Sequence, residues 1–127
     1  MKPSKPSLPA SFGFAIRGIV HAIRHERNMK IHAAAAILVI ILAALLKLDP
    51  IRWVFLVLAA GMVIAAELVN TAVEAVVDLA SPEIHPLARA AKDTAAGAVL
   101  VCAVTAAVIG LIVFYGPVLS WIHETFQ

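Results

Sequence analysis

The stretch WVFLVLAAGMVIAAELVNTAVEAVVD, residues 53–78, decides what this chain can fold into. Its first fourteen residues carry no charge, whereas the next twelve contain three carboxylates and an asparagine. At about 100° per residue, the polar side chains of a helix through this segment share one stripe about 100° wide. The residues of this stripe are Glu67, Asn70, Thr71, Glu74 and Asp78. The pattern predicts an apolar helix with one polar face.

The composition favours a membrane protein. Of the 127 residues, 62% are hydrophobic and 14% are charged, and the mean hydropathy is +0.96. A water-soluble domain of this size would carry far more charge, although an unusually apolar soluble bundle remains the alternative. A single cysteine, Cys102, excludes an internal disulfide. We expect no nucleic-acid partner.

The N-terminal part predicts a tail followed by a surface helix. Residues 1–11 are rich in proline, serine and lysine, which predicts a flexible tail. Residues 12–29 place apolar side chains at helical spacing and basic ones, including Arg17, largely on the opposite side. This is typical of an amphipathic helix lying in a membrane surface. A helix packed against a soluble partner is the alternative.

Three transmembrane helices are predicted after the surface helix. They cover about residues 31–48, 51–80 and 88–121, and each approaches the length of about 20 residues that a bilayer requires. Pro50, Pro82 and Pro86 interrupt the helical pattern between them. We therefore expect an all-α membrane protein, with residues 12–127 forming one domain. Three thin helices close poorly around a core, which favours assembly into an oligomer.

The distribution of lysine and arginine predicts the orientation in the membrane. Six of them precede the first predicted span and two follow the second, against two between the first and second spans. Because positive residues concentrate on the cytoplasmic side, the N-terminus and residues 81–93 should face the cytoplasm. We expect a multi-pass protein of the cytoplasmic membrane.

Glu67 is the first candidate for a functional residue. It lies sixteen residues beyond Ile51, or roughly 24 Å along a helix, which places it near the inner edge of the hydrocarbon. A carboxylate there costs a few kcal/mol, about 2.5–3.5 on insertion scales, unless it faces a partner or a wet cavity. Such acids fit a cation path or phosphoryl transfer at the membrane surface. The chain contains neither of the common glycine-rich nucleotide loops.

Two motifs make the chain resemble a known family. ELVNTAVEAVVD (67–78) is followed by SPEIHPLARAAKD (81–93) and AAGAVLV (95–101). This arrangement is similar to the small integral-membrane lipid kinases of the prokaryotic diacylglycerol kinase and undecaprenol kinase family, and the likeness extends from about Phe12 to Phe114. The sequence of residues 81–88 resembles the undecaprenol kinase branch more closely than the enterobacterial diacylglycerol kinase branch.

The resemblance implies a role for each residue of the site. Glu67 would be the catalytic base that takes the proton from the lipid hydroxyl, and Asn70 would orient the reacting groups. Glu26 and Glu74 would hold the Mg²⁺ that accompanies ATP. Further nucleotide contacts would come from the second connection and the basic surface helix. These contacts are Glu83, His85, Lys92, Asp93 and Arg17.

The resemblance also implies a homotrimer whose active sites are shared between neighbouring subunits. Two positions depart from the family pattern, because Phe14 and Ile84 stand where a tyrosine is common. The expected function is transfer of the γ-phosphate of ATP to a membrane lipid alcohol, with undecaprenol as the substrate. Diacylglycerol is the alternative substrate, and a small oligomeric cation channel or transporter is the alternative from another functional class.

Overall fold

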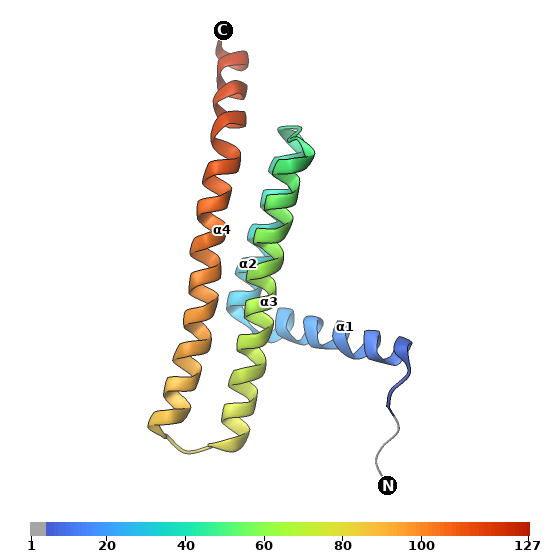
Figure 1. The fold of residues 1–127 in the computed structure, drawn as a ribbon, viewed down its shortest axis with the longest axis vertical. Helices are drawn as coiled ribbons and strands as arrows, with labels where there is room; N and C mark the ends of the chain where they lie inside the picture. The colour runs from blue at the N-terminus through green and yellow to red at the C-terminus, as the bar shows by residue number, and fades with distance from the viewer. Residues whose placement is uncertain (1–4) are drawn as a thin grey trace.

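The computed structural model describes residues 5–127, and these residues form four helices and their connections. The helices are α1 (Leu8–His25), α2 (Arg27–Leu45), α3 (Pro50–Ala80) and α4 (Pro86–Phe126). Helices α2, α3 and α4 run alongside one another, while α1 lies crosswise to them (Figure 1). Each of the three is long and apolar enough to cross a membrane. The predicted all-α fold with three spans is confirmed.

Helix α1 begins at Leu8, earlier than the expected residue 12. Pro9 lies in its first turn, where a missing N–H has no consequence because first-turn N–H groups lack intrahelical partners. The expected flexible tail is therefore helical from Leu8 onward, and residues 1–4 of that tail lie outside the described residues. Residues 8–11, the last of the expected tail, belong to α1 instead.

A corner at Glu26 separates α1 from α2. The backbone of Glu26 is extended, with φ −96° and ψ 122°, so this residue ends one helix and begins the next. The expected surface helix over residues 12–29 thus ends at His25, and residues 27–29 start α2. Ala22 and Met29, on the two sides of the corner, are both 1% exposed. Burial of both side chains accompanies the change of direction, which sequence periodicity alone does not reveal.

The turn between α2 and α3 has a Schellman geometry. Lys47 adopts the left-handed conformation with φ 52°, and the Leu48 N–H donates to the Ala43 carbonyl at 3.1 Å. Asp49 then caps α3 by accepting from the backbone N–H groups of Ile51 and Arg52. Hydrogen bonds from Arg52 hold the pKa of Asp49 below its ordinary value, so the capping carboxylate is ionised at neutral pH.

Helix α3 is the centre of the assembly of helices. Its backbone lies beside those of both α2 and α4, whereas the backbones of these two outer helices stay farther apart. A small core cluster near the α2–α3 turn consists of Ala43, Leu48, Leu56 and Val113. Most other large apolar side chains of α2 and α4 are exposed. The spans therefore do not enclose a core as a closed bundle would.

We predict that Lys47→Gly stabilises the protein. A left-handed non-glycine residue costs about 1–2 kcal/mol, part of which glycine loses again through its greater freedom in the unfolded chain. The expected gain in the free energy of unfolding is about 0.5–1 kcal/mol, measured by thermal unfolding in detergent. Lys47→Ala is the control, since it removes the charge and keeps the strained backbone. Equal melting temperatures for the two variants would contradict the prediction.

Candidate functional site

The buried face of α3 changes from apolar to polar along the helix. Its buried residues follow one another at steps of three and four positions, so they share one face. They are Leu56, Ala59, Val63, Glu67 and Asn70. Glu67 is 1% exposed and Asn70 is 6% exposed. The predicted stripe is present, and its first two members are buried within the chain.

Two buried polar atoms of this stripe lack a partner. The Asn70 amide donates to Oε1 of Glu74 at 3.2 Å, which links two of the predicted site residues. Among residues 5–127, however, neither Oε2 of Glu67 nor Oδ1 of Asn70 has a hydrogen-bond partner. Buried polar groups are nearly always paired, so each exception needs an explanation. Both atoms are free to accept a hydrogen bond from a ligand.

Thr71 belongs to the stripe without joining this network. Its hydroxyl donates to the backbone carbonyl of Glu67 at 2.9 Å, which is a bond within the helix. The polar stripe therefore contains one group, Thr71, that is satisfied locally. The groups left for chemistry are the carboxylates and the amide.

Other titratable groups of the site lie within electrostatic range of the Glu67 carboxyl group. They are His32 on α2, Glu26 at the corner and Glu74 about two turns along α3. The structure thus brings Glu26, distant in sequence, into electrostatic range of the α3 stripe. Both Glu26 and Glu74 are half-buried.

The carboxylates fit a magnesium ion that arrives with a phosphate ligand. Mg²⁺ prefers oxygen ligands and is commonly held by one or two carboxylates together with substrate phosphates and water. Glu26 and Glu74 supply two such carboxylates around Glu67. Within the described part of the chain, no three His, Cys, Asp or Glu side chains form a complete metal cage. The donor set therefore suits a metal shared with a nucleotide better than a structural metal.

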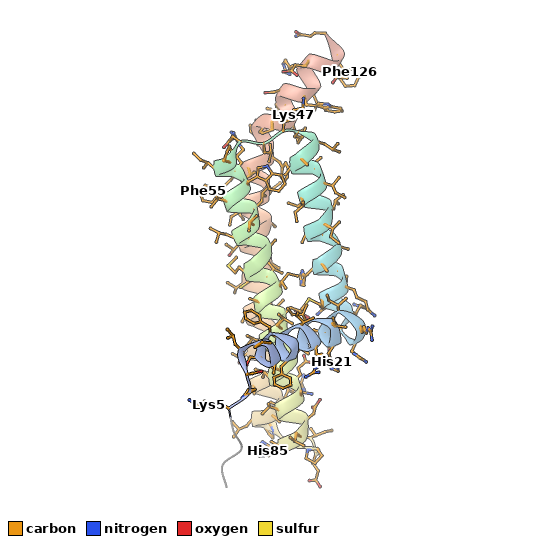
Figure 2. The ribbon with its side chains drawn as sticks, turned by 90° about the vertical axis from the view of Figure 1, so that its right-hand side faces the viewer. Lys5, His21, Lys47, Phe55, His85 and Phe126 are labelled. Atoms are coloured by element: carbon orange, nitrogen blue, oxygen red, sulfur yellow. The ribbon has the colours of Figure 1, made fainter. Side chains whose placement is uncertain are left out.

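A second group of predicted residues lines a cavity between the ends of α3 and α4. This cavity has a volume of about 320 Å³ and includes Glu83, His85, Lys92 and Asp93 in its wall. It lies at the end of α3 opposite the α2–α3 turn, as the positions of His85 and Lys47 show in Figure 2. Four of the expected nucleotide contacts are therefore brought together by the connection between α3 and α4 and by the first turns of α4.

Lys92 forms an ion pair that links the two helices. Its ammonium group lies 2.5 Å from a carboxylate oxygen of Asp78, and the charge of Glu74 also acts on it. Asp93 is 3.8 Å from Arg89, one turn earlier in α4. The ring of His85 accepts from the Leu87 N–H at 3.1 Å and so caps α4. Basic and acidic groups alternate around the cavity.

Arg17 is not among the residues that line the smaller cavity. Its guanidinium stacks over the ring of Phe14 at 4.8 Å on α1, and the backbone of α1 lies close to those of α2 and α3 but not to that of α4. In Figure 2, α1 with its labelled His21 crosses the bundle between the levels of Lys47 and His85. Within one chain, Arg17 is therefore not joined to the cavity that contains Lys92.

A larger cavity lies along the part of α3 that precedes the polar stripe. Its volume is about 730 Å³, and α2, α3 and α4 all contribute to its wall. Alanine, valine and leucine make up most of the lining. Val63 is the last α3 residue in this apolar wall, and Val77 is the first α3 residue in the wall of the smaller cavity. The polar residues from Glu67 to Glu74 lie between them along α3.

Comparison with known sequences identifies the family. The sequence model of the family described as prokaryotic diacylglycerol kinase matches residues 13–114, which include the α3 stripe and both sides of the smaller cavity.

The chain belongs to the prokaryotic diacylglycerol kinase family.

Relatives in this family carry two names. An undecaprenol kinase of Bacillus subtilis is 50% identical over 104 residues, covering 82% of this chain and 85% of the relative. A diacylglycerol kinase of Synechocystis is 42% identical over 116 residues, covering 91% and 66%. A diacylglycerol kinase of Escherichia coli is 32% identical over 96 residues, covering 76% and 79%. The predicted family is confirmed, and with it the class of membrane lipid kinase.

Sequence reasoning left one residue of the site unassigned. Asp78 falls on the predicted stripe, but neither the pattern nor the resemblance assigns it a role. In the structure it pairs with Lys92 across the α3–α4 connection. Its position on the helical stripe is the only sequence feature that points to Asp78, because the sequence does not reveal which side chain of α4 lies opposite this residue.

We predict that Glu67→Met stabilises the fold. The substitution replaces a buried carboxyl with an unpaired oxygen by an apolar side chain of similar length, and a buried unsatisfied group costs about 1–3 kcal/mol. The melting temperature in detergent should therefore rise. Glu124→Met is the control, since Glu124 is exposed near the end of α4. A lower melting temperature for Glu67→Met would mean that the carboxyl group has a stabilising partner.

Proposed function

We propose that this membrane lipid kinase transfers the γ-phosphate of ATP to the hydroxyl group of undecaprenol. The observation that carries the proposal is the buried Glu67, whose Oε2 has no partner among residues 5–127 and whose position on α3 falls between the wall of an apolar cavity and that of a cavity lined by charged groups. The hydrocarbon part of a lipid alcohol requires an apolar environment, and a polyanion such as ATP requires a charged one. The relative named undecaprenol kinase supports the choice of lipid.

Glu67 is the proposed catalytic base. It is the buried carboxylate of the polar stripe, and its Oε2 is available to accept a proton. The hydroxyl oxygen of the lipid attacks the γ-phosphorus, its proton passes to Glu67, and the bond between the γ-phosphorus and the bridging oxygen breaks to release ADP. Positioning and charge neutralisation supply most of the catalysis in such transfers.

Glu26 and Glu74 are the proposed ligands of Mg²⁺. When bound, the ion would neutralise phosphate charge during the transfer. Asn70 donates to Glu74 through its amide and so orients this carboxylate, while its unpaired Oδ1 remains available to a reacting group. Asn70 thereby connects the metal-binding carboxylate with the turn of α3 that carries Glu67.

The smaller cavity is the proposed site of the nucleotide. Lys92 would contact phosphate oxygens, for which it must exchange its pairing with Asp78. Asp93, Glu83 and His85 line the same cavity and would contact the rest of the nucleotide. Arg17 and the other basic residues of α1 would attract the polyanion to the membrane surface. Phe14 and Ile84 provide no hydroxyl group for these contacts.

The proposed orientation places the smaller cavity in the cytoplasm. Lysine and arginine are concentrated at the ends of the spans that flank it, and ATP is a cytoplasmic compound. Helix α1 would lie in the inner surface of the cytoplasmic membrane, with its exposed Phe12, Ile16 and Ile23 among lipid tails. Its crosswise direction relative to the spans supports this placement (Figure 1).

A homotrimer is the proposed assembly. The backbones of α2 and α4 do not approach each other closely, and both helices leave extensive apolar faces that must meet lipid or another chain. A neighbouring chain would also bring a second α1 with its Arg17, which one chain alone does not join to the smaller cavity. Active sites shared between neighbours would therefore combine groups that lie apart here.

Diacylglycerol is the second candidate substrate. Relatives named diacylglycerol kinase are 42% and 32% identical to this chain. Both lipids present a hydroxyl group on an apolar body, so the same base and the same nucleotide site would serve either one. The difference lies in the shape of the apolar part.

We predict lipid-dependent transfer of labelled phosphate from ATP by the purified protein in mixed micelles. Undecaprenol should be phosphorylated with a higher kcat/KM than diacylglycerol. Glu67→Gln should lower kcat at least a hundredfold, since general base catalysis contributes about 10²–10⁴-fold, and it should leave assembly intact. The product is measured in the lipid phase. Normal turnover by Glu67→Gln would remove this residue as the base, and preference for diacylglycerol would overturn the assignment of the lipid.

We also predict that the chain sediments as a trimer in density-matched detergent, with three times the protein mass of one 13.4-kDa chain. Two impaired variants, Glu67→Gln and Arg17→Ala, should regain activity when co-assembled, because a site that combines Glu67 of one chain with Arg17 of its neighbour can then contain no altered residue. Each variant assembled alone provides the control. A monomeric mass, or no recovery in mixed assemblies, would contradict sites shared between neighbours.

A further inference from the structure

His32 occupies one end of the larger, apolar cavity. On α2 the cavity wall extends from Leu42 to His32. On α3 it includes Leu56, Ala59 and Val63, which belong to the same buried face as Glu67. Because α2 and α3 are antiparallel neighbours, His32 and Val63 mark the same end of the cavity. Glu67 follows Val63 by four residues, about one helical turn.

His32 is a polar exception among its neighbours in the wall. The nearest lining positions on α2 are Ala35 and Ala36. The imidazole is half-buried, and among residues 5–127 it makes no side-chain hydrogen bond. The Glu67 carboxyl group lies within electrostatic range of it. A histidine at the edge of an apolar cavity, close to a buried carboxylate, is available to bind a polar group entering from that cavity.

An alcohol has the chemistry that would satisfy both residues. Its O–H can donate one hydrogen bond while its oxygen accepts another. The free Oε2 of Glu67 can accept the first, and an imidazole N–H can donate the second. The apolar wall suits the hydrocarbon adjoining the hydroxyl, and it is unsuited to phosphate or sugar. These complementary features favour a lipid alcohol over a nucleotide at this position.

We propose that His32 positions the substrate by donating a hydrogen bond to the lipid hydroxyl and holding it against Glu67. The proposal rests on the proposed function and adds a residue for which the family motifs provided no role. His32 transfers no proton in this arrangement, since the hydroxyl proton goes to Glu67. It would restrict the hydroxyl to one geometry, and a displacement of about 1 Å in such a geometry can cost about a hundredfold in rate.

The alternative is that His32 fills space between helices. Two substitutions distinguish these roles. His32→Leu retains much of the side-chain volume and removes the donor, whereas His32→Gln retains an N–H donor near the position of the ring nitrogen. A packing role predicts that the leucine variant is as active as the wild type. A positioning role predicts that the glutamine variant is the more active one.

The experiment measures kcat and KM for undecaprenol and for ATP in mixed micelles. We expect His32→Leu to lower kcat/KM for the lipid about tenfold to a hundredfold, while KM for ATP changes less than twofold. His32→Gln should recover most of this loss. His123→Ala is the control, because His123 is exposed in the last turn of α4, and its kinetic constants should equal those of the wild type.

Three outcomes would overturn the role of His32. They are wild-type kinetics in His32→Leu, a loss that His32→Gln does not recover, and an equal effect on ATP and lipid. Melting temperature and sedimentation of each variant verify that the compared proteins are assembled alike. Failure of the proposed function is a separate result, because the wild type itself would then form no phosphorylated lipid.

Discussion

The burial of Glu67 without a partner for Oε2 is the constraint on which the site depends. A carboxyl group without a hydrogen-bond partner is unfavourable inside an apolar helix assembly, and no hydrogen bond within residues 5–127 explains its burial. Neighbouring acids, Glu26 and Glu74, add repulsion to the cost of burial. A site that concentrates negative charge in this way gains stability when a cation and a hydrogen-bond donor bind.

Helix α3 satisfies this constraint because it is central and long. Its 31 residues contact both outer helices along one buried face, and that face is apolar at first and polar beyond Val63. Because the apolar part precedes the polar part along the chain, the same helix contributes to an apolar cavity wall and, farther along, to a charged site. Shortening α3 to a minimal span would remove the polar part from the protein or draw it into hydrocarbon.

Features that depend on helical periodicity could be predicted from the sequence. The α3 stripe and the three spans follow from spacing and proline positions, which act locally. The corner at Glu26 could not be predicted in this way, since burial of Ala22 and Met29 requires knowledge of how α1 meets the other helices. The pairing of Asp78 with Lys92 also depends on the packing of α3 against α4. His32 carried no motif, and its position at the cavity is apparent only in three dimensions.

The corner at Glu26 connects the local fold with the chemistry of the site. Because its backbone is extended, α2 can run beside α3 while α1 departs crosswise, at a level between those of Lys47 and His85. A continuous helix through residues 8–45 would direct the basic groups of α1 along the axis of α2, away from the stripe. The corner instead holds Glu26 within electrostatic range of Glu67. The same residue thus sets the direction of the surface helix and contributes a carboxylate to the site, so a change in one would alter the other.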